Sequence, residues 1–213
     1  MPSRVPAPDV DAVVASLKRL ASRRTRDEMK RYGIPSDKAL GVPMAALLKL
    51  AKQTGRHHDL AAALWRTDIY EARMLASLVD EPDRVTPAQM DRWCRDFDNW
   101  GIVDTVCFKL FDQSPHAWKK ATEWTSRKPE FEKRAGFVLM ACLALHDKKA
   151  PDAAFLPFLA LIERAAGDDR NFVRKGVDWA LRSIARRSAR LKSAAGDVSR
   201  RMKTAHATAR PRT

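Results

Sequence analysis

Apolar residues along this chain recur mainly at helical spacing. In residues 40–51 they fall at i, i+4, i+7, i+8 and i+11, as Leu40, Met44, Leu47, Leu48 and Ala51. A second stripe, at i, i+3, i+4 and i+7, consists of Phe155, Phe158, Leu159 and Ile162. Each spacing predicts one apolar face of a helix. Residues 137–145 are apolar on every side and too long for a typical strand, so they predict a buried helix that begins near Pro129 or Glu130.

Turn and capping residues divide the chain into helical segments. Thr86, Pro87 and Gln89 provide an N-cap, a proline at the first helical position and a capping-box residue. Ser114-Pro115 repeats the first two of these signals. No stretch alternates convincingly with a period of two, and no two-residue hairpin turn is present in the sequence. The sequence therefore predicts an all-α fold with about eleven or twelve helices.

A weak internal repeat opens three of the expected helices with an aromatic residue, followed one turn later by a basic residue. The three copies are Tyr70-x-x-Arg73, Phe131-x-x-Arg134 and Phe172-x-x-Lys175. Trp100 lies about midway between the first two copies. Helix pairs that repeat every ~30–45 residues are typical of an α-solenoid, in which these basic residues would line a concave face. The alternative, that Arg73 and Arg134 are ordinary surface residues, stays open at this point.

The net charge of +14 is concentrated at the C-terminal end of the chain. Residues 182–213 contain ten Lys and Arg residues and one Asp, which gives +9 and leaves +5 for residues 1–181. This balance favours a polyanionic partner, nucleic acid before an anionic membrane surface. A solvated basic tail that only aids solubility is the alternative interpretation.

Other features of the composition exclude several classes of protein. Hydrophobic residues make up 45% of the chain, too many for a disordered protein, and no apolar run approaches the ~20 residues of a membrane-spanning helix. The three cysteines are far apart and no CxxC or HxxxH pair is present, so no metal site is predicted. The N-terminal residues lead into no apolar segment. We therefore expect a cytoplasmic, nucleoid-associated protein with buried thiols at Cys94, Cys107 and Cys142.

Several short motifs occur in a fixed order along the chain. The main ones are residues 98–104 (DNWGIVD), 131–137 (FEKRAGF) and 171–182 (NFVRKGVDWALR), and residues 32–34 (YGI) and 64–73 (LWRTDIYEAR) fit with them. Together, over roughly residues 10–190, they resemble the AlkC/AlkD-type DNA alkylation repair family, the HEAT-like-repeat DNA glycosylases. Trp100 and Asp104 match that family's Trp-x-x-x-Asp motif. The resemblance implies a right-handed α-solenoid of HEAT-like repeats with a concave basic face.

The resemblance also implies an activity. It indicates a DNA glycosylase of base excision repair that hydrolyses the N-glycosidic bond of N3- or N7-alkylated purines in duplex DNA. Alkylation at these nitrogens makes the base cationic and a good leaving group, and its departure leaves oxocarbenium character on the deoxyribose. A carboxylate beside the sugar stabilises that cation and positions water, and aromatic faces favour it as well. The resemblance implies no metal, no organic cofactor and no base-flipping pocket.

The matching positions assign roles to individual residues. The resemblance implies that Asp104 is the carboxylate and that Trp100 and Trp179 are aromatic walls against the sugar and backbone. Trp100 and Asp104 are i and i+4, so they share a helix face. The expected phosphate contacts are Arg134, beside the lesion, together with Lys175, Arg182 and Arg73. The alternatives are plain core packing for Trp100 and Trp179 and a helix-surface position for Asp104. The remaining tryptophans are expected to be core or helix-packing residues, and they are Trp65, Trp93, Trp118 and Trp124.

The sequence departs from the family pattern at two places. Gly101 follows the motif tryptophan where relatives often carry Asp, and it would cost ~1 kcal/mol inside a helix but less at a helix start. After residue 190 the chain becomes rich in Ala, Ser, Arg and Lys, so we expect a short last repeat. We therefore expect one domain over residues 1–190 and a basic, partly disordered extension over residues 191–213. The alternative function is that of a non-catalytic helical-repeat protein that binds damaged or structured DNA; a monomer is expected in either case.

Overall fold

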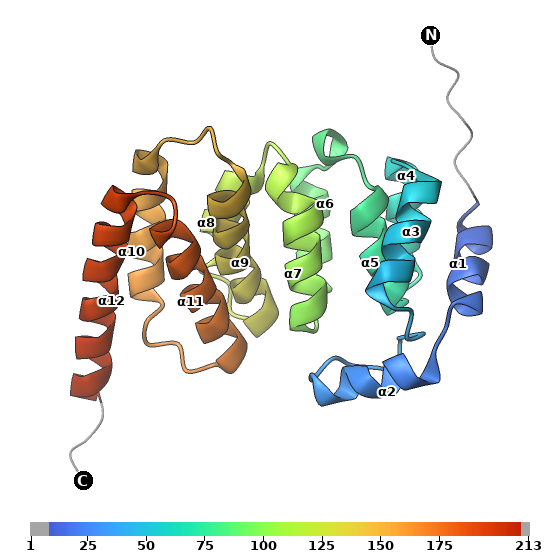
Figure 1. Cartoon of the computed structure of the whole chain (residues 1–213), viewed down its shortest axis with the longest axis horizontal. Helices are drawn as coiled ribbons and strands as arrows, with labels where there is room; N and C mark the ends of the chain where they lie inside the picture. Colours follow the sequence, from blue (N-terminus) through green and yellow to red (C-terminus); the bar gives the residue numbers. More distant parts are fainter. Residues whose placement is uncertain (1–8, 210–213) are drawn as a thin grey trace. The chain divides into compact units, whose positions relative to one another are not determined.

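The computed structural model describes the backbone of residues 9–209 and the side chains up to Thr204. Within these residues it contains twelve α-helices, three short 3₁₀ helices and no strand, which confirms the predicted fold class (Figure 1). The chain divides into two compact units, residues 1–114 and residues 115–213, and each is described by itself. No helix in the described part of the chain is both long and apolar enough to cross a membrane.

Unit 1 contains the first seven α-helices and two 3₁₀ helices. They are α1 (Val10–Arg19), α2 (Arg23–Arg31), α3 (Met44–Thr54), α4 (His58–Arg66), α5 (Tyr70–Val79), η1 (Pro82–Arg84), α6 (Pro87–Arg95), α7 (Trp100–Lys109) and η2 (Phe111–Gln113). Helix α5 packs against α3, α4 and α7, and so lies at the centre of this unit. Leu64, Leu75 and Met90 are fully buried in its core.

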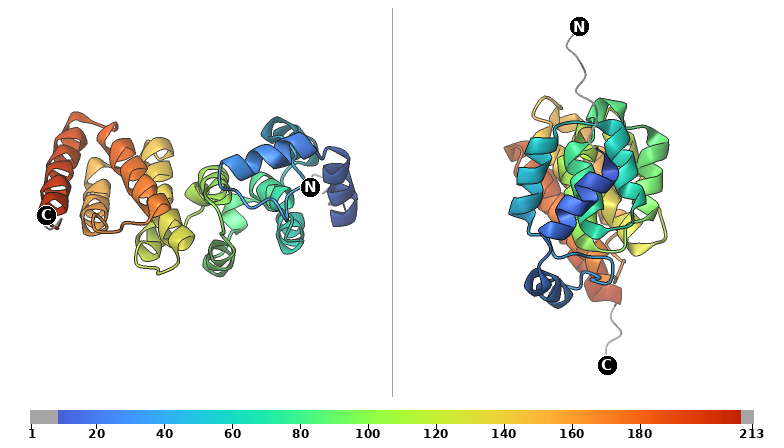
Figure 2. Two further views of the ribbon diagram at one scale, coloured as in Figure 1. Left: turned by 90° about the horizontal axis from the view of Figure 1, so that it is seen from below. Right: turned by 90° about the vertical axis from the view of Figure 1, so that its right-hand side faces the viewer.

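Unit 2 contains five α-helices and one 3₁₀ helix. They are α8 (Ala117–Trp124), α9 (Glu130–His146), η3 (Asp152–Phe155), α10 (Leu156–Arg164), α11 (Asn171–Ala185) and α12 (Ala189–Ala209). Helix α9 packs against α8 and α11, and α12 packs against α10 and α11 (Figure 2, yellow to red). The central helix α9 is buried on most sides, as predicted from residues 137–145, and Pro129 is its N-cap.

Two sequence predictions about helix boundaries are only partly confirmed. Thr86 caps α6 by accepting a hydrogen bond from the Gln89 N–H at 3.1 Å, but the Gln89 side chain donates to Asp80 instead of closing the capping box. Helix α8 begins at Ala117, so the predicted start at Ser114-Pro115 is wrong by two residues. The physical reason is that Ser114 ends η2 and Pro115 lies in the turn that follows it.

The predicted apolar face over residues 40–51 is also only partly correct. Leu40 lies outside α3, because Gly41 adopts a left-handed backbone with φ of 81° and Pro43 then caps the helix. Leu47 is buried, whereas Met44 and Leu48 are exposed. Helix α3 packs mainly against α5, so only a narrow stripe of it is covered.

A buried carboxylate holds the segment before α3 against α5. Glu71 is fully buried, and its two oxygens accept the backbone N–H groups of three consecutive residues at 2.7–3.2 Å; these are Leu40, Gly41 and Val42. Hydrogen bonds to a charged acceptor are stronger than neutral ones, and they remove the cost of burying the carboxylate. Glu71 therefore fixes the path of the chain that leads into α3.

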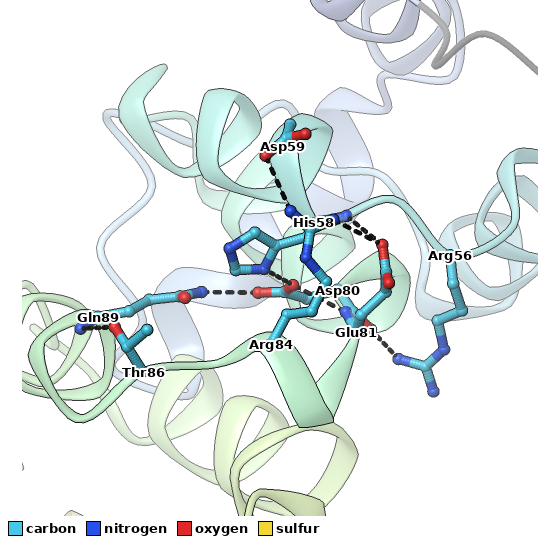
Figure 3. A network of polar contacts seen from close by, with 8 residues as sticks. All are labelled: Arg56, His58, Asp59, Asp80, Glu81, Arg84, Thr86 and Gln89. Atoms are coloured by element: carbon cyan, nitrogen blue, oxygen red, sulfur yellow. Dashed lines mark hydrogen bonds and ion pairs between the residues drawn. The ribbon is translucent and has the colours of Figure 1, made fainter. Parts of the chain in front are cut away.

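A second polar cluster joins the start of α4 to the end of α5 (Figure 3). The fully buried Asp80 carboxylate contacts His58 Nδ1 at 2.7 Å and accepts a hydrogen bond from Gln89 Nε2 at 2.7 Å. Burial raises the pKa of Asp80 above its ordinary value, against the opposing effect of these hydrogen bonds. The adjacent His57 is the N-cap of α4, so the His57-His58 pair serves this helix junction.

The C-terminal residues fold differently from the expected extension. Helix α12 is 21 residues long, so the prediction of a short last repeat is wrong. Leu191, Ala195 and Val198 are buried along one stripe of α12, and the alanine-rich composition favours the helix. The part of the predicted extension up to Ala209 thus belongs to α12, and residues 210–213 lie outside the described residues. A single domain over residues 1–190 stays a prediction.

Candidate functional site

Helix α7 presents the tryptophan and the carboxylate of the Trp-x-x-x-Asp motif. Trp100 is the first residue of α7 and Asp104 lies one turn later, so the two side chains share a helix face. Both residues are half-buried, which places neither in the core nor fully in solvent. Asn99 caps the helix, because its side-chain oxygen accepts the Ile102 N–H at 3.1 Å. The motif therefore lies at a defined helix N-terminus.

The Trp100 side chain is held in place by the C-terminal end of α2. Its indole Nε1 donates to the backbone carbonyl of Tyr32 at 2.8 Å. Tyr32 is 67% exposed, so an aromatic side chain that is open to solvent accompanies the anchored indole. Tyr32 belongs to the motif at residues 32–34, but no spacing in the sequence links it to Trp100.

The presence of glycine at position 101 is explained by the nearby Tyr70 side chain of α5. A Cβ atom at this position would lie 2.8 Å from the hydroxyl oxygen of Tyr70 and 3.3 Å from Ile34 Cδ1. Gly101 is the second residue of α7, which confirms that it sits at a helix start. The departure from the family pattern therefore makes room for the Tyr70 phenol beside the motif.

The Tyr70 phenol lies in an acidic environment next to Asp104. Burial is the main effect that raises its pKa, and the charges of Glu71, Asp98 and Asp104 raise it further. The phenol is therefore a neutral group across the physiological pH range. The neutral Tyr70 phenol on α5 thus lies close enough to Asp104 for the charge of that carboxylate to act on it.

Arg73, an expected DNA contact, is engaged inside unit 1. Its guanidinium lies 2.8 Å from an Asp68 oxygen and 5.2 Å from the centroid of the Trp65 ring. The Arg73 side chain is only 16% exposed, and Nε also donates to the Trp65 carbonyl at 3.4 Å. The structure places Arg73 among packing residues and apart from the α7 pair.

Arg134, the expected phosphate contact beside the lesion, is buried in unit 2. Only 5% of the residue is exposed, and its Nη1 donates to the backbone carbonyl of Phe172 at 2.8 Å. The rings of Phe131 and Phe172 lie 5.2 Å apart next to it. The repeated aromatic-x-x-basic motif therefore contributes contacts between the starts of α9 and α11.

Helix α11 brings the remaining expected site residues of unit 2 onto one face. Lys175, Trp179 and Arg182 fall at i, i+4 and i+7, with the two cations exposed and the tryptophan half-buried. Arg182 forms an exposed ion pair with Asp178 at 2.8 Å. Arg186, to which no role was assigned from the sequence, is also exposed and continues the stripe at i+11, and its spacing from Arg182 can be found in the sequence. We call Lys175, Trp179, Arg182 and Arg186 the α11 stripe.

The other tryptophans and the cysteines are structural, as expected. Trp65 and Trp93 are buried and stack with ring centroids 3.9 Å apart, and Trp124 is fully buried. Trp118 is half-buried and stacks on Phe158 with the ring centroids 5.0 Å apart. All three cysteines are buried, and none of them forms a disulfide. Within residues 9–209, no group of three or more His, Cys, Asp or Glu side chains is arranged to hold a metal ion.

Comparisons with known proteins agree with this architecture. The family model of the DNA alkylation repair enzyme matches residues 13–211. A solved structure from a new family of proteins related to the HEAT-like repeat DNA glycosylases, with affinity for branched DNA structures, matches with a TM-score of 0.81. It is 20% identical, and the match covers 92% of this chain and 83% of that one, which shows a HEAT-like repeat fold. No curated protein matches significantly.

Proposed function

We propose that this chain, which belongs to the DNA alkylation repair enzyme family, is a DNA glycosylase that removes N3- or N7-alkylated purines from duplex DNA. The observation that carries this proposal is the pairing of Trp100 with Asp104 on one face of α7. The indole is anchored through Tyr32, and Gly101 leaves room for the neutral Tyr70 phenol beside the carboxylate. A carboxylate held next to an aromatic face suits a reaction that develops positive charge on a sugar.

In the proposed reaction the bond between C1′ and the purine nitrogen breaks, and one water molecule adds to C1′. The alkylated purine leaves as a neutral base because it was cationic beforehand, and the water releases one proton to solvent. The Asp104 carboxylate stabilises the oxocarbenium-like sugar and orients the water, and the face of Trp100 stabilises the same cation. The reaction needs no base-flipping pocket, since both groups act on the sugar.

We further propose that the α11 stripe binds the DNA backbone. Lys175 and Arg182 are exposed cations that suit phosphate oxygens, and the half-buried Trp179 between them offers an apolar surface for a sugar. The ion pair of Arg182 with Asp178 is exposed and therefore weak, so a phosphate can replace the carboxylate. For Arg134, burial and the Phe172 contact support a positioning role at the start of α11.

Release of free methylpurines from methylated duplex DNA tests the proposed activity. The wild type should release N3- or N7-methylpurine faster than spontaneous depurination does, and Asp104→Asn should abolish most of this excess. Loss of electrostatic stabilisation of this kind lowers rates by about 10²–10³-fold. Asp83→Asn is the matched control, because Asp83 is an exposed carboxylate in η1 of the same unit. Release by the wild type at the spontaneous rate would exclude the proposal.

The alternative is a non-catalytic protein that binds structured DNA. The structural match to a protein with affinity for branched DNA favours this second candidate. It predicts no base release and tighter binding to a branched junction than to a linear duplex of equal length. Because the alternative gives Asp104 no part in chemistry, Asp104→Asn should then have no effect beyond that of Asp83→Asn.

A further inference from the structure

A basic hollow lies at the turn that joins α11 to α12 and includes the C-terminal end of the α11 stripe, Arg182 and Arg186. Its volume is about 630 Å³, and it is lined by Arg182, Ala185, Arg186, Ser188, Ala189 and Lys192. Three of these six residues are cations and none is an acid. The other three lining residues, Ala185, Ser188 and Ala189, are small and uncharged. The lining of the hollow is therefore positively charged.

The turn that forms this hollow is held rigidly by Arg187. Its Nη1 donates to the carbonyls of Ala144 and Asp147, and its Nη2 donates to that of Ala150, each at 2.9 Å. The guanidinium also lies 4.2 Å from the centroid of the Phe155 ring. Arg187 thus ties the turn to the end of α9 and to η3. Since its own guanidinium is used in this way, the charge at the hollow comes from its neighbours.

Ser188 fixes the other side of the turn. Its hydroxyl donates to Asp152 at 2.6 Å and accepts the Leu191 N–H at 3.1 Å, so it caps α12. The helix dipole and the first-turn N–H groups of α12 add positive potential at the same place. The backbone of the hollow is therefore preorganised, and binding there needs little ordering of the turn.

The cations of the hollow differ in their existing partners. Arg182 is paired with Asp178, whereas Arg186 and Lys192 are exposed and have no ion-pair partner among the described residues. Arg186 also ends the α11 stripe, which spans about 16 Å from Lys175 at 1.5 Å per residue. That length corresponds to about five base pairs of duplex. A DNA strand that ran along α11 would therefore reach the hollow several nucleotides away from Lys175, the start of the stripe.

We infer that this hollow binds a backbone phosphate of duplex DNA and acts as a remote clamp for the strand that the α11 stripe contacts. Arg186, the C-cap of α11, and Lys192 in α12 contact the phosphate oxygens from two sides. The inference rests on the proposed function only for the identity of the partner as DNA. It assigns to the α11–α12 turn a binding role separate from base release.

The salt dependence of binding to undamaged duplex DNA tests this inference. Affinity is measured by fluorescence anisotropy with a labelled duplex of about 20 base pairs between about 50 and 200 mM KCl. Removing one phosphate contact should lower the slope of log K against log salt by about 0.9, and it should weaken binding about eightfold at 0.1 M salt. We expect this change for Arg186→Ala and for Lys192→Ala.

Arg190→Ala is the matched control for Arg186→Ala. Arg190 is an exposed arginine in the first turn of α12 that does not line the hollow, and it should leave the slope nearly unchanged. None of these side chains is buried, so we expect each variant to fold. Thermal unfolding checks this expectation. Equal slopes for Arg186→Ala and Arg190→Ala would overturn the inference. The inference would also be overturned if millimolar inorganic phosphate, added as a competitor, left the slope of log K against log salt for DNA binding unchanged.

Base release separates this inference from the proposed activity. If the wild type releases no base but the two lining variants change the slope, the hollow stands and the glycosylase proposal fails. If the wild type releases base and the slopes do not change, the activity stands and the hollow fails as a clamp.

Discussion

Gly101→Ala tests whether the close approach of Tyr70 shapes the α7 motif. An alanine Cβ would lie 2.8 Å from the Tyr70 hydroxyl oxygen and 3.1 Å from Asn99 Oδ1. The Tyr70 residue is half-buried, so the room for the phenol to retreat is restricted. Asn99 is the N-cap of α7 and cannot move without weakening that cap. The substitution therefore strains both the phenol and the start of the helix.

The magnitudes of two opposing effects decide whether Gly101→Ala raises or lowers the free energy of unfolding. Alanine gains at most ~1 kcal/mol over glycine in a helix interior, and less in the first turn. Forcing an extra carbon into a packed site costs ~1–3 kcal/mol. We therefore expect Gly101→Ala to lower the free energy of unfolding by about 1–2 kcal/mol, or the melting temperature by roughly 2–8 °C for a chain of this size.

Thermal unfolding followed by circular dichroism measures this effect, and a second substitution identifies its cause. Tyr70→Phe removes the hydroxyl that the new Cβ would meet, so Gly101→Ala/Tyr70→Phe should recover most of the lost stability. Gly176→Ala is the matched control in α11, where the nearest atoms would lie at an ordinary 3.5 Å, and it should be neutral or stabilising. The reasoning is refuted if Gly101→Ala stabilises the protein, or if removal of the phenol oxygen gives no recovery.

Two further predictions concern unit 2. Gly136→Ala should lower the free energy of unfolding by about 2–3 kcal/mol, because the new Cβ would lie 2.7 Å from the Thr125 backbone nitrogen. Thermal unfolding measures this change, and an unchanged melting temperature would contradict the close packing of α8 on α9. Hydrogen bonds from Arg170, and then from Lys133, hold the pKa of Asp168 below its ordinary value of 3.8, so this carboxylate stabilises the fold above about pH 4 and loses that effect as the pH falls. Asp168→Asn should therefore cost about 2 kcal/mol in urea unfolding at pH 7, and the difference from the wild type should shrink toward pH 3; a constant difference would refute it.

The sequence predicts helices best where apolar residues cover most of a helix. Residues 137–145 predict the buried helix α9, because an apolar run of this length is too long for a typical strand, and the predicted start lies near Pro129 or Glu130, where α9 begins. The stripe from Phe158 to Ile162 is likewise buried in α10. Spacing fails for Leu40 because Gly41 has a left-handed backbone and because the segment donates backbone hydrogen bonds to Glu71, which hold it outside the helix. Such tertiary contacts have no counterpart in local periodicity.

The candidate site is predictable only in part. Spacing alone places Trp100 with Asp104, since residues four apart share a helix face. The burial of Arg134 could not be predicted, because it depends on the Phe172 carbonyl 38 residues further along the chain. The role of Gly101 follows from the Tyr70 hydroxyl, which reaches it from another helix. Long-range contacts of this kind decide which basic residues remain free for DNA.

The most direct test of the central claim is single-turnover release of 7-methylguanine from a duplex that carries one such lesion. We expect release by the wild type well above spontaneous depurination, near-wild-type release by Asp83→Asn, and a loss of about 10²–10³-fold in Asp104→Asn. All three proteins should be equally folded by circular dichroism. Equal release by Asp104→Asn and the wild type would contradict the claim that this carboxylate stabilises the reacting sugar.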